Sequence, residues 1–269
     1  MVYLNLLFNS SSLFDVWNIV KFAFNSDTYE VIGSETSSET GSETGGVLKV
    51  FYPEGSYSPS KQPQGGIGFF ASQPDIFLAE EVVFNYTVLF DESFNPMFGG
   101  KLPGLFIGNS SDKNSMIGAS GGKHINDTTA SCRIAWRADF GAEAYVYLPT
   151  KNHHDDYFNI PGLTINNKYG DSLWRNFLTF NPNTWNNVSI HLRLNTFDET
   201  TYKPITNGFL SVNINNESYS FDKMIWRTDP NYFINAILFE TFFGGSSEKY
   251  ATPHDTWTFF KDVSIEKIN

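Results

Sequence analysis

The stretch EVVFNYTVLF, residues 81–90, places a large apolar side chain at every second position. The apolar series runs from Val82 to Phe90, whereas Asn85 and Thr87 fall on the opposite face. Because successive side chains of a β-strand point to opposite faces, this alternation predicts a strand with one buried face and one wet face. Such half-buried strands are typical of antiparallel sheets.

The same period of two recurs along the chain, and turn residues separate the runs. The runs with this pattern are Val47–Tyr52, 188–194, 210–214, 236–243 and 256–265. No stretch of comparable length carries a helical stripe of apolar residues. We therefore predict an all-β fold, an antiparallel β-sandwich of the jelly-roll type, with one curved sheet whose concave face can hold an extended polymer.

Composition supports a folded, aromatic-rich, acidic protein. The chain has 269 residues, of which 17% are aromatic and 17% charged, and its formal net charge is −11. This length suffices for one large β domain with a sizeable core. The acidity argues against nucleic acid as a partner, and it means that a polyanionic substrate needs a locally positive site.

We expect three regions along the chain. Residues 1–33 form an N-terminal extension, either a leader or an extra strand. Residues 34–46, SETSSETGSETGG, lack large apolar side chains and predict a loop or linker. Residues 47–269 form the main domain.

Six Asn-x-Ser/Thr sequons suggest a secreted or cell-wall glycoprotein, although residues 1–8 make a poor signal peptide. They begin at Asn9, Asn85, Asn109, Asn126, Asn187 and Asn216. No stretch is long and apolar enough to span a membrane. Cys132 is the single cysteine, which excludes an internal disulfide, and we expect a buried thiol.

Three short motifs carry the candidate site: GGKLPGL at 99–105, SCR at 131–133 and YVYLP at 145–149. The last two have the character of strands. Residues i and i+2 of a strand share a face, so Ser131 lies beside Arg133 and Tyr145 beside Tyr147. With Lys101, these side chains would line one face with cations, a hydroxyl and two phenols.

These three motifs, in this order, resemble polysaccharide lyase family 14, which contains alginate lyases and chlorovirus polyuronate lyases. Glucuronan lyases of family 20 are related. The similarity extends over about residues 45–267, from VLKVFYPEGSYSPSKQPQGGIGFF at 47–70 to FKDV at 260–263. The resemblance implies β-elimination in a uronic-acid polymer such as alginate or glucuronan. We expect no cofactor, no metal and a monomeric protein.

The expected chemistry has three parts. The substrate carboxylate must be neutralised, a base must take the C5 proton, and an acid must protonate the departing C4 oxygen. Arg133 and Lys101 suit the first part, and Tyr145 or Tyr147 the other two. Adjacent cations are expected to favour the phenolate. The motifs do not decide which tyrosine is the base, or whether Lys101 shares that role.

Further candidates have weaker support. We expect Ser131, Arg137 and His191 to contact substrate, Ser131 alternatively orienting Arg133. His153-His154-Asp155-Asp156 contains metal-ligand residue types, but we interpret it as a solvated loop.

Two rival functions remain. One is a non-catalytic glycan-binding or cell-wall protein on the same fold. The other is a β-sandwich glycoside hydrolase, which requires a carboxylate pair across the sheet face; Asp139 and Glu143 are weak candidates for it. The same two acidic residues are alternatively plain ion-pair partners of Arg133 and Arg137.

Overall fold

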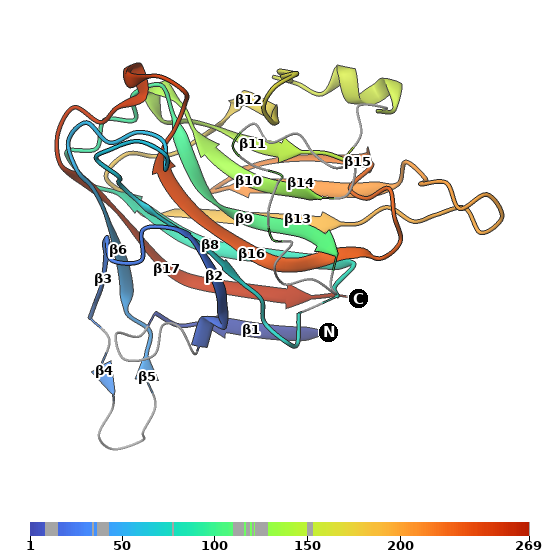
Figure 1. The fold of residues 1–269 in the computed structure, drawn as a ribbon, viewed down its shortest axis with the longest axis horizontal. Coiled ribbons are helices and arrows are strands. Elements are labelled where there is room, and N and C mark those ends of the chain that lie inside the picture. The colour runs from blue at the N-terminus through green and yellow to red at the C-terminus, as the bar shows by residue number, and fades with distance from the viewer. Residues whose placement is uncertain are drawn as a thin grey trace.

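The computed structural model describes residues 1–8, 16–33, 35–36, 43–76, 78–109, 116, 119, 121, 129–149 and 153–268. Two antiparallel sheets face each other across one core, which confirms the predicted β-sandwich (Figure 1). We call them the back sheet and the front sheet. Among the described residues, three 3₁₀ helices add to the strands: η2 (Ala138–Phe140), η3 (Asp155–Asn159) and η4 (Glu248–Tyr250).

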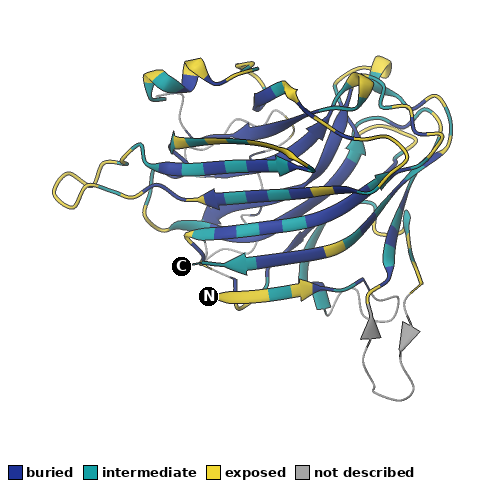
Figure 2. Cartoon of the chain, turned by 180° about the vertical axis from the view of Figure 1, so that it is seen from behind, coloured by how far each residue is buried: buried dark blue, intermediate teal, exposed yellow. Residues whose placement is uncertain are grey.

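The back sheet has the order β15 (Glu217–Met224), β14 (Gly208–Ile214), β13 (Asn186–Arg193), β8 (Glu81–Phe90), β17 (Thr256–Lys267), β6 (Val47–Tyr52) and β3 (Tyr29–Ile32). A further strand, β1 (Val2–Leu6), also pairs with β17. The predicted alternation is confirmed here, since buried and part-exposed residues alternate along β6 and β14 (Figure 2). This sheet therefore has one face in the core and one face in water.

The front sheet has the order β12 (Asp171–Thr179), β11 (Gly141–Tyr147), β10 (Ala130–Trp136), β9 (Gly100–Asn109), β16 (Tyr232–Phe243), β7 (Ile67–Ala71) and β2 (Ile19–Phe24). Its central strands are buried on both faces: every residue of β10 is buried, and so is every residue of β9 except the last. One face packs into the main core. The other face carries a second, smaller buried cluster that includes Phe106, Tyr145 and Tyr147.

The N-terminal segment is part of the sandwich. Within residues 1–33, β1 joins the back sheet beside β17, β2 joins the front sheet beside β7, and β3 extends the back sheet beside β6. Trp17 is fully buried and stacks on Phe8, with ring centroids 5.0 Å apart. The structure therefore has the domain begin well before residue 47, and the segment adds three strands rather than one.

The Ser/Glu/Thr-rich tract at 34–46 lies largely outside the described residues. Its described parts include β4 (Glu35–Thr36) and β5 (Glu43–Thr44), which pair with each other as a separate two-stranded sheet. The predicted character of the rest of this tract stays a prediction.

Candidate active site

The pairing of β10 with β11 assembles the heart of the site. Ser131 is the partner of Tyr147, and Arg133 is the partner of Tyr145. Partners in a ladder point to the same face, so all four side chains lie on the outer face of the front sheet. The intervening Cys132 points into the main core and is fully buried. The shared face predicted from the i, i+2 spacing is thus confirmed.

Strand β9 brings Lys101 beside these residues because its glycines allow a close approach. A Cβ atom on Gly104 would lie 1.9 Å from the carbonyl oxygen of Cys132, and one on Gly100 would lie 2.0 Å from the Trp136 ring. Neither position accepts a side chain, so the GGKLPG motif is needed for packing as well as for its lysine. Nζ of Lys101 lies 4.1 Å from the centroid of the Tyr145 ring.

Arg133 lies against both phenols, with its guanidinium carbon 5.8 Å from the Tyr145 ring centroid and 5.7 Å from that of Tyr147. Its Nη1 donates to the carboxylate of Glu240 on β16. The other two nitrogens, Nε and Nη2, are buried and have no hydrogen-bond partner within the described part of the chain. These two N–H groups share one edge of the planar guanidinium, which is the edge that binds a carboxylate through two parallel bonds.

A second arginine flanks the cluster at the end of β10. Arg137 donates to Glu143, which also accepts a 2.7 Å hydrogen bond from the Ser172 hydroxyl. Arg175 approaches the other oxygen of Glu143 at 3.6 Å. The guanidinium of Arg137 lies 6.0 Å from the Tyr145 ring centroid, which places it at the site. The ion pair between Arg137 and Glu143, predicted as the structural alternative, is confirmed.

The environment of Lys101 favours its neutral form. Burial is the main cause that holds the pKa of this amine well below its usual range, and the charges of Arg137 and Arg133 add to it. Glu143 and Glu240 act in the opposite direction. An amine that loses its proton easily is able to accept one from a substrate.

Tyr145 behaves in the opposite way, and here the sequence-based expectation is wrong. Burial raises the pKa of this phenol, and its neighbour Tyr147 raises it further. Arg133 and a 3.1 Å hydrogen bond from the backbone N–H of Gly170 to the phenol oxygen lower it, but they do not compensate. The cation was expected to favour the phenolate, yet desolvation outweighs it and Tyr145 keeps its proton.

Two residues predicted to contact substrate are placed differently: the Ser131 hydroxyl is bonded within the protein, and His191 lies in the back sheet. The Ser131 hydroxyl is fully buried and donates to the backbone oxygen of Ala119 at 2.6 Å. His191 lies on β13 in the back sheet, where its Nε2 is 2.8 Å from a Glu81 carboxylate oxygen. His191 is therefore not part of the front-sheet cluster.

The two histidines of the loop at 153–156 make different contacts. His153 stacks on Tyr157 with centroids 4.0 Å apart, and its Nε2 is 4.0 Å from a carboxylate oxygen of Asp171. His154 instead accepts the backbone N–H of Asp156. Among the described residues, no group of three His, Cys, Asp or Glu side chains is arranged to hold a metal ion.

Sequence reasoning missed Glu240. The only signal was a carboxylate within a largely apolar run, 236–243. Glu143 and Glu240 are both buried carboxylates on the site face, and each is held by an arginine. Both carboxylates are thus engaged in ion pairs with arginines.

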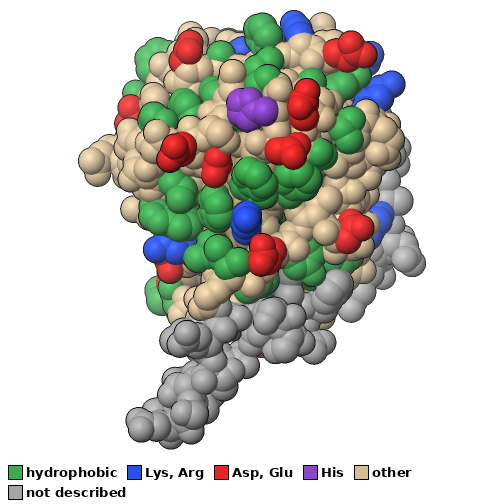
Figure 3. Space-filling model, turned by 90° about the vertical axis from the view of Figure 1, so that its left-hand side faces the viewer, with side chains coloured by type: hydrophobic (Ala, Val, Ile, Leu, Met, Phe, Trp, Pro, Cys, Tyr) green, Lys and Arg blue, Asp and Glu red, His purple; other side chains and the backbone are tan. Residues whose placement is uncertain are grey.

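Two carboxylates, Glu143 and Glu240, lie among the cations of the site, whereas other acidic side chains lie on the surface of the molecule. Asp and Glu side chains are scattered over the end of the molecule in Figure 3 rather than gathered into one patch. Lys101, Arg133 and Arg137, by contrast, converge on Tyr145. A chain with a net charge of −11 thus still gathers three basic side chains at one place on the front sheet. In the described residues, no helix has the length and apolar character needed to cross a membrane.

The fold and the cluster together define a jelly-roll β-sandwich with a cationic and phenolic site on the outer face of one sheet. Residues 40–263 match the sequence model of the family Polysaccharide lyase 14, and the chain belongs to that family.

Three relatives illustrate the similarity. Exolysin of Paramecium bursaria Chlorella virus 1 is 26% identical over 208 residues, which is 71% of this chain but only 30% of the length of that relative. The marine PL-14 alginate lyase from Aplysia kurodai superposes with a TM-score of 0.79 at 25% identity, over 99% of this chain and 98% of that one. The endo-β-1,4-glucuronan lyase from the fungus Trichoderma reesei shares the fold, with a TM-score of 0.54 at 10% identity over 99% and 94% of the two chains.

Proposed function

We propose that this protein is a polysaccharide lyase that cleaves a uronic-acid polymer, of the alginate or glucuronan type, by β-elimination. The observation that carries the proposal is the contact of Lys101 and Arg133 with the Tyr145 ring on one sheet face. Family membership and the similarity to an alginate lyase over nearly the whole chain support it.

The reaction divides among these side chains. Neutral Lys101 takes the C5 proton, the electron pair forms the C4–C5 double bond, and the bond from C4 to the glycosidic oxygen breaks. Tyr145 gives its proton to that oxygen, which leaves as the hydroxyl of the shortened chain. Arg133 binds the substrate carboxylate through its Nε and Nη2 edge, which is buried and has no hydrogen-bond partner among the described residues. Negative charge accumulates on that carboxylate as the C5 proton leaves. The opposite pKa directions of Lys101 and Tyr145 support this division.

The position of Lys101 directly over the Tyr145 ring bears on the substrate. Base and acid approach the sugar from one side, because Nζ is only 4.1 Å from the ring centroid. Such a pair removes a proton and an oxygen that lie on the same face of the sugar. Mannuronate and glucuronate have this arrangement, whereas guluronate does not. We therefore expect mannuronan or glucuronan to be preferred over guluronan.

The test follows the absorbance of the conjugated double bond that elimination creates, on purified protein with mannuronan, guluronan, glucuronan and a neutral β-glucan. Lys101→Met and Tyr145→Phe are each expected to lower kcat by about 10²–10⁴-fold, the usual contribution of a general base or acid. Matched controls are Lys49→Met and Tyr219→Phe on the back sheet, which are expected to keep wild-type kcat.

Two outcomes would contradict the proposal. Wild-type turnover in the Lys101 and Tyr145 variants would overturn the assignment of residues. Absorbance that stays flat on every polymer, from folded protein that still binds one of them, would favour the non-catalytic glycan-binding alternative. The near-complete burial of Arg133 and Tyr147 is the observation that favours this alternative.

Secretion and a monomeric state complete the proposal. Among the sequons, Asn216 is exposed in the turn that joins β14 to β15, a position open to glycosylation. A mobility shift on glycosidase treatment of the protein from its native source, lost in Asn216→Gln, would support this site. Light scattering of purified protein would test the monomer.

A further inference from the structure

A buried carboxylate at a site for a polyanion is unexpected, and Glu240 is such a group. It lies on β16, where the pairing with β9 shifts register between Leu238 and Phe242. Its side chain is only 8% exposed, and its carboxylate is bonded to Nη1 of Arg133. An anion here would repel the substrate unless it served another purpose.

The geometry of the guanidinium indicates that purpose. A planar guanidinium has five N–H donors in a fixed fork, so a bond at Nη1 fixes the direction of the opposite edge. That edge, formed by Nε and Nη2, has no hydrogen-bond partner in the part of the chain that the structure describes. The Glu240 bond thus turns the unfilled edge of Arg133 away from β16.

Charge balance gives Glu240 a second effect. The basic side chains of Lys101, Arg133 and Arg137 face the carboxylates of Glu143 and Glu240 around the two phenols, Tyr145 and Tyr147. Glu240 raises the pKa of Lys101, against the larger lowering by burial and by the two arginines. Without Glu240, the cluster would carry one more net positive charge.

We propose that Glu240 is a positioning residue for the lyase reaction: it holds Arg133 so that the Nε and Nη2 edge is aligned for the uronate carboxylate, and it limits the positive charge around Lys101. This inference rests on the proposed function. It assigns no contact between Glu240 and the substrate, because the Glu240 carboxylate acts through Arg133 and through the field at Lys101.

Three substitutions separate the two effects. Glu240→Gln keeps an oxygen that accepts from Arg133 but removes the charge. Its kcat/KM profile is expected to move to lower pH, because Lys101 then loses its proton at lower pH, with little change in kcat at the optimum. Glu240→Ala also releases Arg133, and kcat is expected to fall by about tenfold or more, as misaligned groups typically cause. Glu240→Asp keeps the carboxylate and is expected to recover part of that loss.

The matched control is Glu80→Gln, which alters the carboxylate partner of another buried arginine, Arg227, away from the site. It is expected to leave kcat and the pH profile unchanged, and thermal unfolding of every variant checks the fold. Wild-type kcat in Glu240→Ala together with an unmoved profile in Glu240→Gln would overturn the inference while the lyase function stands. An inactive wild-type protein would overturn the proposed function, and the role of Glu240 with it.

Discussion

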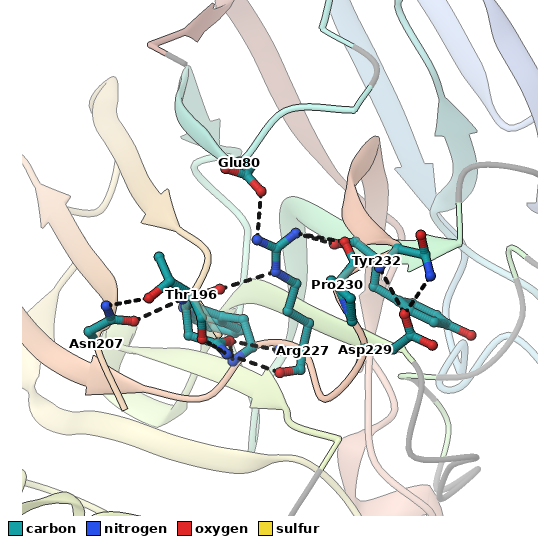
Figure 4. A network of polar contacts seen from close by, with 10 residues as sticks. Glu80, Thr196, Asn207, Arg227, Asp229, Pro230 and Tyr232 are labelled. Carbon is teal, nitrogen blue, oxygen red and sulfur yellow. Dashed lines mark hydrogen bonds and ion pairs between the residues drawn. The ribbon is translucent and has the colours of Figure 1, made fainter. Parts of the chain in front are cut away.

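Two arginines of this chain are almost completely buried, and they use their donors differently. Arg227 follows β15, and all three nitrogens of its guanidinium donate hydrogen bonds to other residues of the protein (Figure 4). Its Nε donates to the backbone oxygen of Asn195 at 3.1 Å, and Nη1 donates to those of Pro230 and Tyr232. Nη2 donates to Glu80 at 2.6 Å. Every nitrogen of Arg227 therefore has a partner, and together these bonds fasten three loop segments to one another.

Arg133 is buried just as deeply but has a protein partner at Nη1 alone among the described residues. Leaving a buried donor without an acceptor costs about 1–3 kcal/mol. A purely structural arginine has no reason to carry that cost, as Arg227 illustrates. The comparison separates the two arginines by their unfilled hydrogen-bonding capacity: Arg227 has no nitrogen left for a ligand, whereas the proposed function fills the remaining edge of Arg133 with a uronate carboxylate.

The largest expected effect comes from exchanging each arginine for lysine. Arg133→Lys keeps the charge but loses the planar fork, so we expect kcat/KM on the preferred uronate polymer to fall by about 10²–10³-fold. Arg227→Lys is expected to keep the wild-type value. Steady-state kinetics of the two variants, side by side, checks this. Equal losses in both would remove the distinction between the two arginines.

Substitution of Arg227 is expected to change the free energy of unfolding more than it changes kcat. Arg227→Met removes four hydrogen bonds and takes the Arg227 donor from the buried backbone oxygen of Asn195. We expect the free energy of unfolding in urea to fall by about 2–4 kcal/mol. The folded fraction should retain wild-type kcat. A variant as stable as the wild type would show that these bonds contribute little to the fold.

The pH dependence of the free energy of unfolding can detect the lowered pKa of Lys101. Its pKa is lowered in the folded state, so between that value and the ordinary value of about 10.4 the unfolded chain binds the extra proton. Stability therefore rises with pH in that window, by at most about 1.4 kcal/mol per pH unit. Lys101→Met removes this contribution, so its stability relative to wild type should decline from pH 7 to pH 10 in urea unfolding. A constant difference would contradict the lowered pKa.

The smallest effect is expected for Glu80→Gln. The Glu80 side chain is 52% exposed, so its ion pair with Arg227 is screened by solvent. We expect a loss of about 0–1 kcal/mol by urea unfolding, because three further bonds of Arg227 remain. A much larger loss would mean that the carboxylate, rather than the backbone oxygens, fastens Arg227.

The sequence predicted that one face of the back sheet is buried and the other faces solvent. It also predicted that Ser131 shares a face with Arg133 and Tyr145 with Tyr147. Both follow from the two-residue period of a strand. It did not predict β12, where positive φ angles at Trp174 and Asn176 interrupt the alternation. The sequence assigned no strand to the GGKLPGL motif, and only the structure shows Gly100 and Gly104 inside β9, against β10.

The electrostatics of the site depended on contacts between distant strands. Glu240 is 107 residues from Arg133 in the chain, so no local pattern joins them. The sign of the Tyr145 pKa shift depended on burial of the outer face of the front sheet, which the i, i+2 spacing of the motifs does not reveal. Ser131, Arg137 and His191 remain predictions as substrate contacts, and His191 lies in the other sheet.

Cys132 gives this protein an internal reporter. Its thiol is fully buried between the two sheets, on the strand that presents Ser131 and Arg133 to the other side, and burial raises the pKa of the thiol to about 12. A thiol-reactive reagent can therefore modify it only after β10 separates from the core. The labelling rate of the unmodified wild-type chain would measure how often this strand opens, and its slowing by an added oligouronate would report binding without any label or tag.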